Sequence, residues 1–361
     1  MPPSTSETLW IRCGTTGHQE VADNLKTRLL ADDDPIDILI TGPTMKTANP
    51  QGERAVTNFL ANTSPNALLW LGGAIDHATV FKCLGQSIPV GCADLEAEHV
   101  KQLRKRNLLR RNRLDQIHFV MARDEEARQA LIRLGVPANV IETSQELMPD
   151  LPSLPCDEDE RHAFAGQLGT RPTWLAAGAN LSDVDMLAKA FKHAARASHR
   201  LLLTIVTPEK PEQMAESFAS NGLTVSLQST GDHPTDDVQV YIADSMDELG
   251  LFFRVASMTL ICCTFGAGAK VDPFGAAALG CAIISGPQFA PYANKFQRLR
   301  AEGAVCIVEN TDDLGGTVVD LLSVEKTARM ANAGWEVSTK GLDVLDRLED
   351  LTRRHLLRFG A

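Results

Sequence analysis

Short apolar runs and longer amphipathic segments alternate along the first 150 residues of the chain. The apolar runs are typical of buried strands, and the amphipathic segments, with apolar residues three and four positions apart, are typical of helices. The pattern predicts strands at 9–14, 36–42, 66–73, 88–94, 115–123 and 138–144, and helices at 15–33, 53–63, 77–87, 97–114 and 124–135. This alternation indicates a doubly wound α/β domain with a parallel sheet.

Three prolines in quick succession, Pro149, Pro152 and Pro155, interrupt this pattern. Dense proline without periodicity is typical of an extended linker, so the sequence predicts a domain at 1–150 and a linker at 151–171. Strand and helix then alternate again, which predicts a second domain at 172–340, and an amphipathic helix at 341–361 closes the chain. The pattern therefore indicates two Rossmann-like domains.

The stretch from Val238 to Asn294 has clear strand and helix boundaries. An alternating run ends at Asp244 and Ser245, which suits a strand that leads into a capped helix start. The segment 273–280 begins with proline and ends with glycine, as helices often do. Because ligands of parallel sheets bind beyond the carboxyl ends of the strands, the loops of this stretch are candidate binding segments.

This stretch also contains several blocks that resemble a known family. The blocks are DSMDELGLFFRVASMTLI, a glycine-rich loop, DPFGAAALG and SGPQFAPYANKFQRL. They are similar in order and spacing to GDTMGELGLLYALAD, a glycine-rich loop, NPLEPAALG and FGPHTFNF of the 3-deoxy-D-manno-octulosonic acid (Kdo) transferases. The resemblance runs from about Leu9 to near the C-terminus. It implies the GT-B architecture, in which two Rossmann-like domains face each other across a cleft.

Composition and charge narrow the classes of partner. The formal net charge of −11 argues against a nucleic-acid-binding protein, although it leaves room for a local basic face. None of the eight cysteines forms a CxxC pair, and several lie in apolar strand-like runs, which indicates a reducing cytoplasm. Kdo transferases commonly carry an N-terminal membrane anchor, but this sequence shows neither a signal peptide nor an apolar run that could span a bilayer. Any contact with the inner membrane is therefore expected to be peripheral.

The resemblance implies a donor site for CMP-Kdo in the second domain. In the family, a Pro-Arg-His-Pro-Glu turn, a Met-Gly-Glu segment and an Asn-Pro-Leu-Glu helix start hold the CMP group. The turn corresponds here to Pro208, Glu209 and Lys210, followed by a second proline and a glutamate. Glu209 stands where the family has arginine, so a charge that would neutralise phosphate is reversed, and Lys210 compensates for it only in part.

The other two donor segments differ from the family as well. The corresponding positions are Met246, Asp247, Glu248, Asp272, Pro273, Phe274 and Gly275. The first three begin a helix whose free N–H groups favour an anion, but a capped helix without a ligand would have the same pattern. In the second segment, Gly275 replaces the glutamate that should accept hydrogen bonds from ribose, while Asp272 keeps an acceptor. This segment indicates either a changed donor pocket or only a helix that starts with proline.

The base that would activate the acceptor corresponds to His18. In the family, a Ser-Val-Gly-Glu motif places a carboxylate at the start of the first helix, where it takes the proton from the acceptor hydroxyl. Here the motif consists of Thr15, Thr16, Gly17 and His18. A histidine can serve as a general base in place of the carboxylate. The alternative is that His18 only caps the helix.

Two further family segments lack their charged residues. The Glu-Thr-Glu-Leu-Trp-Pro segment after the third strand is replaced by 72–77, which begins with Gly72 and ends with Asp76 and His77. The Gly-Asn-Leu-Lys segment corresponds to 144–147, which contains no lysine. In the family, these charges should stabilise the reaction centre as CMP leaves. Asp76 and His77 are either a replacement pair or ordinary turn residues.

A basic segment at 100–114 contrasts with the acidic composition of the whole chain. Seven lysine and arginine residues surround an apolar stripe there. Such a helix suits anionic lipid headgroups or the phosphates of a lipid acceptor, and a solvated helix face is the alternative. Because aromatic residues are not interleaved with the basic ones, nucleic acid is not expected as a partner.

Together these features suggest a cytoplasmic inverting glycosyltransferase that resembles the Kdo transferases. The resemblance implies transfer of Kdo from CMP-Kdo to a phosphorylated lipid A precursor in lipopolysaccharide biosynthesis, with no metal or other cofactor. The replaced residues support an alternative, a diverged GT-B paralogue that binds a sugar nucleotide or a lipid with weak or no catalysis. A third hypothesis is a GT-B relative, such as a sugar-nucleotide epimerase, that uses another donor.

Overall fold

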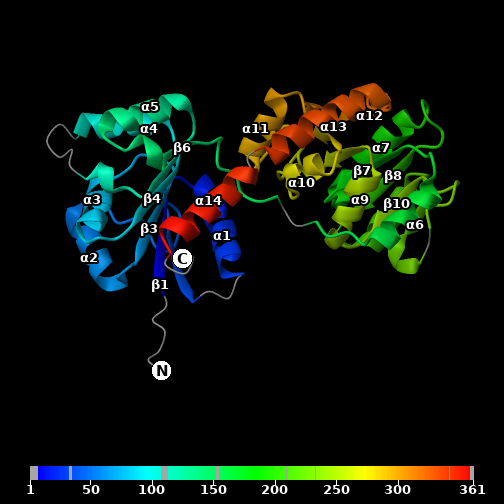
Figure 1. Ribbon diagram of the computed structural model, residues 1–361. Coiled ribbons are helices and arrows are strands. Elements are labelled where there is room, and N and C mark those ends of the chain that lie inside the picture. The colour runs from blue at the N-terminus through cyan, green and yellow to red at the C-terminus, as the bar shows by residue number, and fades with distance from the viewer. Residues whose placement is uncertain are drawn as a thin grey trace. The chain divides into compact units, whose positions relative to one another are not determined.

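The chain folds into two compact α/β units, which Figure 1 shows in the computed structural model. One unit comprises Met1–Asp150 and Gly341–Ala361, and the other comprises Leu151–Lys340. The structure describes residues 7–31, 35–106, 113–151, 154–207, 210–231, 233–340 and 342–357, with the backbone alone for 102–106. The doubly wound α/β class that the sequence predicts is confirmed in both units.

The first unit is built around a parallel sheet with the strand order β2-β1-β3-β4-β5-β6. Its strands are β1 (Glu7–Cys13), β2 (Ile36–Thr41), β3 (Ala67–Leu71), β4 (Val90–Leu95), β5 (Phe119–Ala122) and β6 (Ile141–Thr143). The helices between them are α1 (Gly17–Leu30), α2 (Glu53–Thr63), α3 (His77–Gly85), α4 (Ala97–Arg106) and α5 (Glu125–Leu134). The strand order reverses between β1 and β3, and ligands of doubly wound sheets bind at such a switch point.

Helix α14 (Leu342–His355) packs on the first unit, although the sequence predicts a separate terminal helix at 341–361. Its buried stripe is formed by Val344, Leu345, Leu348 and Leu351. These residues share one apolar core with Leu9 of β1 and with buried residues of α1. The helix therefore covers the sheet face on which α1 lies, while α2, α3, α4 and α5 contribute to the core on the opposite face.

The second unit contains a parallel sheet with the order β13-β12-β11-β7-β8-β10-β9. Its strands are β7 (Thr173–Ala177), β8 (Leu202–Val206), β9 (Val225–Leu227), β10 (Val240–Ala243), β11 (Met258–Ile261), β12 (Ala282–Ser285) and β13 (Val305–Ile307). Its helices are α6 (Glu158–Leu168), α7 (Val184–Ala194), α8 (Pro211–Ser220), α9 (Leu249–Val255), α10 (Pro273–Ala278), α11 (Ala293–Ala301), α12 (Leu314–Asp320) and α13 (Val324–Thr339). Here the strand order reverses between β7 and β11.

Helix α6 lies inside the segment 151–171 that the sequence predicts to be an extended linker. Asp157 caps the helix, because its side chain accepts hydrogen bonds from the N–H groups of Asp159 and Glu160. The helix buries Phe164, whose ring lies 5.3 Å from the rings of both Tyr241 and Phe252. The prediction of an extended linker is therefore wrong for residues 158–168, because a capped helix that buries Phe164 and Leu168 packs there.

Candidate functional site

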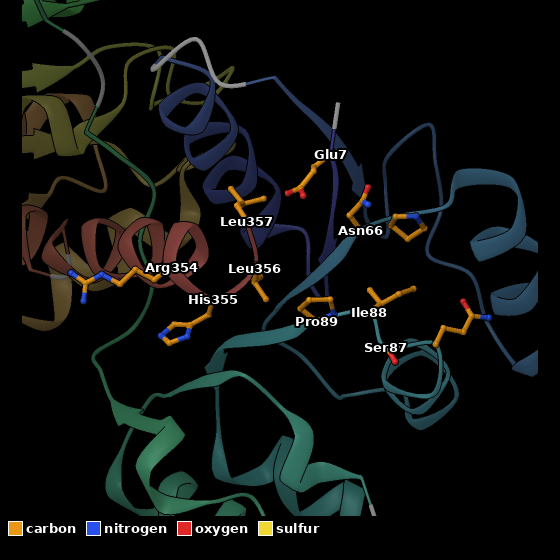
Figure 2. A pocket seen from close by; sticks show the side chains of 11 residues that line it. Glu7, Asn66, Ser87, Ile88, Pro89, Arg354, His355, Leu356 and Leu357 are labelled. Carbon is orange, nitrogen blue, oxygen red and sulfur yellow. The ribbon is translucent and has the colours of Figure 1, made fainter. Parts of the chain in front are cut away.

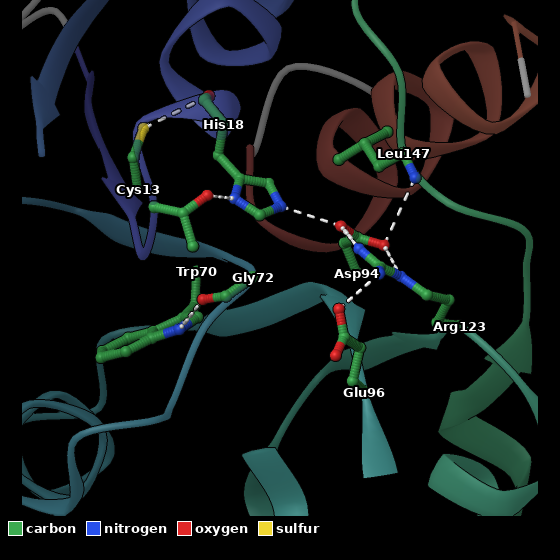
Figure 3. Close-up of polar contacts among 9 residues, drawn as sticks. Cys13, His18, Trp70, Gly72, Asp94, Glu96, Arg123 and Leu147 are labelled. Atoms are coloured by element: carbon green, nitrogen blue, oxygen red, sulfur yellow. Dashed lines mark hydrogen bonds and ion pairs between the residues drawn. The ribbon is translucent and has the colours of Figure 1, made fainter. Parts of the chain in front are cut away.

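The polar residues at the carboxyl edge of the first sheet form a connected network, which Figure 3 shows. His18 follows β1, Asp94 lies near the end of β4, and Arg123 directly follows β5. Because all strands are parallel, these residues lie along the same edge of the sheet although they are far apart in the sequence. The edge includes the switch point between β1 and β3.

His18 lies in the first turn of α1 and is almost fully buried, with 8% of its surface exposed. Its Nε2 atom lies 2.8 Å from Asp94 Oδ2, and its Nδ1 atom lies 2.6 Å from the hydroxyl of Thr15. Thr16 occupies the N-cap position of α1, and no side chain caps the helix. The alternative in which His18 serves only as a cap is therefore wrong, because both ring nitrogens are bound to other side chains.

Asp94 is the centre of the network. Its carboxylate is 2% exposed, and its backbone has a φ of 58° at a point where the register of β4 and β5 shifts. Arg123 donates two hydrogen bonds to it, from Nε to Oδ1 at 2.9 Å and from Nη2 to Oδ2 at 2.6 Å. Arg123 also pairs with Glu96, and the backbone N–H of Leu147 lies 3.3 Å from Oδ1. A non-glycine residue in the left-handed region at a strand irregularity is a strained feature that functional sites often contain.

The protonation state of Asp94 determines which nitrogen of His18 is free to accept a proton. Burial raises the pKa of the Asp94 carboxyl, but the hydrogen bonds from His18 and Arg123 outweigh it and bring the pKa below its ordinary value. Asp94 is therefore ionised at neutral pH, and a carboxylate can only accept hydrogen bonds. The proton between the two side chains consequently lies on Nε2 of His18. In neutral His18, Nδ1 keeps its lone pair and accepts a hydrogen bond from Thr15.

Gly72 makes room for the imidazole of His18. A Cβ atom at residue 72 would lie 2.1 Å from His18 Cε1, and Gly72 has a φ of +56°. The family carries a glutamate-containing segment after the third strand, and this chain has 72–77 in its place. This chain resembles the family but has His18 where the family has the glutamate of Ser-Val-Gly-Glu, and Gly72 where the family segment begins with glutamate. The two differences are linked in the structure, because the His18 ring occupies the space that a side chain at residue 72 would need.

The predicted replacement pair at the end of this segment has another role. Asp76 is the N-cap of α3, and its side chain accepts hydrogen bonds from the N–H groups of Ala78 and Thr79 and from the Thr79 hydroxyl. The ring of His77 stacks on Phe81, with the centroids 5.0 Å apart. The hydrogen bonds of Asp76 favour the alternative in which this pair consists of turn residues.

The predicted donor residues follow strands at the carboxyl edge of the second sheet. Lys210 follows β8 and is the N-cap of α8, and Met246, Asp247 and Glu248 form a 3₁₀ turn after β10. Pro208 and Glu209 lie outside the described residues, as do residues 107–112 of the basic segment 100–114 and the side chains of 102–106. Whether the described positions bind a donor stays a prediction.

Glu248 lines a hollow of about 230 Å³ next to α6. Burial, followed by the nearby carboxylate of Glu160, raises the pKa of Glu248. A carboxyl group in such surroundings repels phosphate when it is ionised. Glu248 is therefore better suited to accept a hydrogen bond from a sugar or base than to contact the phosphate of a nucleotide.

The polar contacts at the start of α10 stabilise the fold. Asp272 caps α10 by accepting a hydrogen bond from the N–H of Phe274, and it pairs with Lys295 at 2.5 Å. Pro273, Phe274 and Gly275 are all buried. These contacts favour the alternative that the sequence left open here, a helix that starts with proline.

Asp94 and Arg123 are absent from the residues that the sequence singles out. Both are charged residues at the ends of apolar strands, and this is the signal in the sequence that could have marked them. A similar group lies at the switch point of the second sheet. Asn180 follows β7 and donates a hydrogen bond to Cys263 Sγ at 3.1 Å, and Cys263 follows β11 with a φ of 64°. This pair was also missed, because its two members are 83 positions apart.

The first unit has a hollow of about 540 Å³ at the opposite edge of its sheet (Figure 2). Its lining includes Glu7 at the start of β1, Asn66 and Pro89 just before β3 and β4, and Leu356 and Leu357 after α14. Parallel sheets bind their ligands at the carboxyl ends of the strands, and this hollow lies at the amino ends. The His18 edge is therefore the candidate site of this unit.

Comparisons with known proteins identify relatives in one family. No family model matches the chain. The chain is 26% identical over 253 residues to the 3-deoxy-D-manno-octulosonic acid transferase of Haemophilus influenzae, covering 67% of this chain and 58% of that protein. The transferase of the same name from Rickettsia felis is 24% identical over 172 residues, covering 47% of this chain and 37% of that protein. The chain thus spans less than two thirds of the length of either relative.

A solved structure supports the fold. The crystal structure of Acinetobacter baumannii MurG matches 95% of this chain and 99% of its own, with a TM-score of 0.53 and 13% sequence identity. This likeness supports the GT-B class that the sequence predicts. Among the described residues, none of the helices has the length and apolarity needed to cross a bilayer.

Proposed function

Because the chain is related in sequence to the Kdo transferases, we propose that it is an inverting glycosyltransferase that transfers Kdo from CMP-Kdo to a phosphorylated lipid A precursor. The observation that supports a catalytic role is the buried pair of His18 and Asp94 at the switch point of the first sheet. A histidine whose second nitrogen is held by a carboxylate is oriented to act as a general base.

In the proposed reaction, His18 Nδ1 takes the proton of an acceptor hydroxyl while the hydroxyl oxygen attacks the anomeric carbon of Kdo. The bond from that carbon to the phosphate oxygen breaks, and CMP leaves with the electron pair. Attack from the side opposite to CMP inverts the configuration. Asp94 stabilises the imidazolium that forms, and Arg123 holds Asp94 in place.

Thr15 marks where the acceptor hydroxyl would lie. Its hydroxyl is 2.6 Å from His18 Nδ1, and Thr15 is exposed to solvent. An acceptor hydroxyl within hydrogen-bond reach of Nδ1 would take the place of this hydroxyl. In the free protein, the Thr15 hydroxyl then binds His18 Nδ1 in place of the acceptor. Thr15 is therefore not itself needed for transfer.

The remaining partners in the proposal follow the family. We assign CMP-Kdo to the second unit, near Lys210 and the turn formed by 246–248, and the lipid acceptor to the first unit. The basic segment 100–114 would meet anionic lipid at the inner membrane, which makes the association peripheral. No metal is assigned a role in this reaction.

A transfer assay with purified protein, CMP-Kdo and a lipid A precursor tests this proposal. We expect product with the wild type, loss of at least about 10²-fold in rate for His18→Gln, and a change of less than about tenfold for Thr15→Ala. His162 on α6 is exposed, so His162→Gln is the matched control and should behave like the wild type.

Three results would contradict parts of the proposal. An unchanged rate for His18→Gln removes His18 from the mechanism. Complete loss of activity in Thr15→Ala assigns the hydroxyl a direct chemical role. If the wild type makes no product but calorimetry shows that it binds CMP, the chain is a non-catalytic paralogue.

A further inference from the structure

Among the residues that the structure describes, Arg12 of the first unit is a buried cation without an anionic partner. It is the penultimate residue of β1, and 7% of its surface is exposed. Its Nε atom is buried and finds no hydrogen-bond partner within the described parts of the chain. Throughout the part of the chain that the structure describes, its side chain has neither a hydrogen bond nor an ion pair, and it stacks on Trp70 with the guanidinium carbon 3.9 Å from the ring centroid.

The polar groups around Arg12 are satisfied without it. Its neighbours across the sheet are Thr41 on β2 and Trp70 on β3. Thr41 accepts a hydrogen bond from Trp10 Nε1 at 2.9 Å and donates one to Asn49 at 2.8 Å. Trp70 Nε1 donates to the carbonyl of Gly72 at 2.9 Å. Asp76 is the carboxylate whose charge most affects the pKa of Arg12, but its side chain caps α3 and forms no ion pair with Arg12 among the described residues.

A buried arginine in the second unit shows the usual arrangement. Arg171 is also 7% exposed, and its guanidinium donates hydrogen bonds to the carbonyls of Arg200 at 2.7 Å, Thr235 at 2.9 Å and Val238. Arginine is almost never fully buried unless it is paired, since removal of the charge from water is unfavourable. Arg12 departs from this rule, whereas Arg171 follows it.

We propose that Arg12 binds an oxyanion, either a phosphate or a carboxylate, at the carboxyl end of β1. A guanidinium offers a planar fork of donors that matches both groups. The position is near the candidate site, because Trp70 donates a hydrogen bond to the carbonyl of Gly72, and Gly72 packs against the His18 ring. A ligand anchored on Arg12 would therefore lie close to the His18 network.

The electrostatics of Arg12 agree with this assignment. Burial lowers the pKa of the Arg12 guanidinium to about 10, and the charge of Asp76 offsets part of that effect. Arg12 thus stays charged at neutral pH while being poorly solvated. Such a charge gains more from an incoming anion than an exposed arginine does, because screening by water is weaker.

Thermal unfolding with and without anions tests the proposal. The wild type, Arg12→Met, Arg12→Lys and the matched control Arg171→Met are titrated with inorganic phosphate or with acetate, and sodium chloride keeps the ionic strength constant. We expect one of the two anions to raise the Tm of the wild type. In Arg12→Met, that anion should bind about 10- to 100-fold more weakly, as expected for loss of a charge-assisted hydrogen bond. Arg12→Lys should keep part of the response.

The variants also differ in their unfolding without added anion. Arg12→Met should raise the Tm by about 2–4 °C, since it removes an unpaired buried charge and keeps an apolar stem against Trp70. Arg171→Met should lower the Tm, because three carbonyls lose their donor, and should keep the anion response. A response to phosphate alone identifies a phosphate site, and a response to acetate alone identifies a carboxylate site. The proposal is overturned if neither anion stabilises the wild type, if Arg12→Met responds like the wild type, or if Arg12→Met does not fold.

Discussion

The carboxyl edges of the two sheets hold their charged side chains in different ways. At the first edge, His18, Asp94 and Arg123 bind one another, side chain to side chain. At the second edge, Asp272 caps α10 and pairs with Lys295, and Asp183 accepts a hydrogen bond from the N–H of Asn180. Asp183 and Asp272 of the second edge are thus tied to helix starts, as Asp76 is at the first edge, whereas His18, Asp94 and Arg123 form a network of their own.

This difference supports the proposed placement of the chemistry at the first edge. A carboxylate that caps a helix stabilises the fold directly. A buried network of charged side chains contributes less reliably to stability, because each charge must be removed from water before it can be paired. The strained backbone of Asp94 adds to this cost. A structure that keeps such a network at a switch point is expected to use it for function.

The largest effect expected from breaking the first network is on catalysis. Asp94→Asn should reduce the transfer rate by about 10²- to 10⁴-fold, because an amide can donate to Nε2 and so favour the wrong tautomer of His18. Steady-state kinetics of the transfer reaction measure this loss. It should appear in kcat more than in KM, because Asp94 acts through His18.

Asp124→Asn is the matched control for this prediction. Asp124 caps α5 by accepting a hydrogen bond from the N–H of Ala127 at 2.7 Å, and asparagine is an equally good cap. Its rate should equal that of the wild type. Equal rates for Asp94→Asn and the wild type would show that the network is structural. The difference between the two edges would then say nothing about where catalysis occurs.

A smaller effect is expected on stability when the packing of His18 is disturbed. Gly72→Ala should lower the free energy of unfolding by about 2–4 kcal/mol, since it adds left-handed strain and a clash with the His18 ring. Gly135 also has a positive φ, but a Cβ atom there meets nothing within 4 Å. Gly135→Ala should cost about 1–2 kcal/mol from strain alone. Urea unfolding of both variants measures the difference, and equal losses would show that His18 moves aside freely.

The smallest effect expected concerns acid stability. The folded-state pKa of Asp94 lies below its ordinary value of 3.8, so its contribution to stability is complete above about pH 4 and disappears as the pH falls through the lowered pKa. Below pH 4, the stability of the wild type should therefore decrease more steeply with falling pH than that of Asp94→Asn. Urea unfolding of both proteins at pH values from about 2.5 to about 7 measures how steeply the stability of each depends on pH. Parallel curves would show that Asp94 is not held as an ion.

Much of the fold could be predicted from local patterns. Strands β1 to β5 follow apolar runs, and the predicted limits of α2 coincide with its observed limits, Glu53–Thr63. Helix α6 was missed because the neighbouring prolines suggested a linker, while its anchor, Phe164, packs on rings from distant strands and helices. The sequence pattern sets no limits for helices α11, α12 and α13. Their packing depends on tertiary contacts more than on any strong local signal.

The candidate site could be predicted only in part. His18 was found through the resemblance at the start of the first helix, since that motif is local. Asp94 and Arg123 were not, because their partners are 76 and 29 positions away and the strand irregularity at Asp94 leaves no mark in the sequence. The sequence also does not mark Arg12 as a binding residue, because its surroundings come from distant parts of the chain. The absence of a counter-ion is a property of the folded neighbourhood.

The return of α14 to the first unit has a consequence for how the protein is made. On the ribosome, residues 7–150 emerge first, but the apolar face that α14 covers stays open until 342–357 have been synthesised. Domains usually fold in the order of their synthesis, and here the amino-terminal unit is begun first and completed last. Nascent chains stalled before α14 should therefore depend on chaperones to keep that exposed sheet from aggregating.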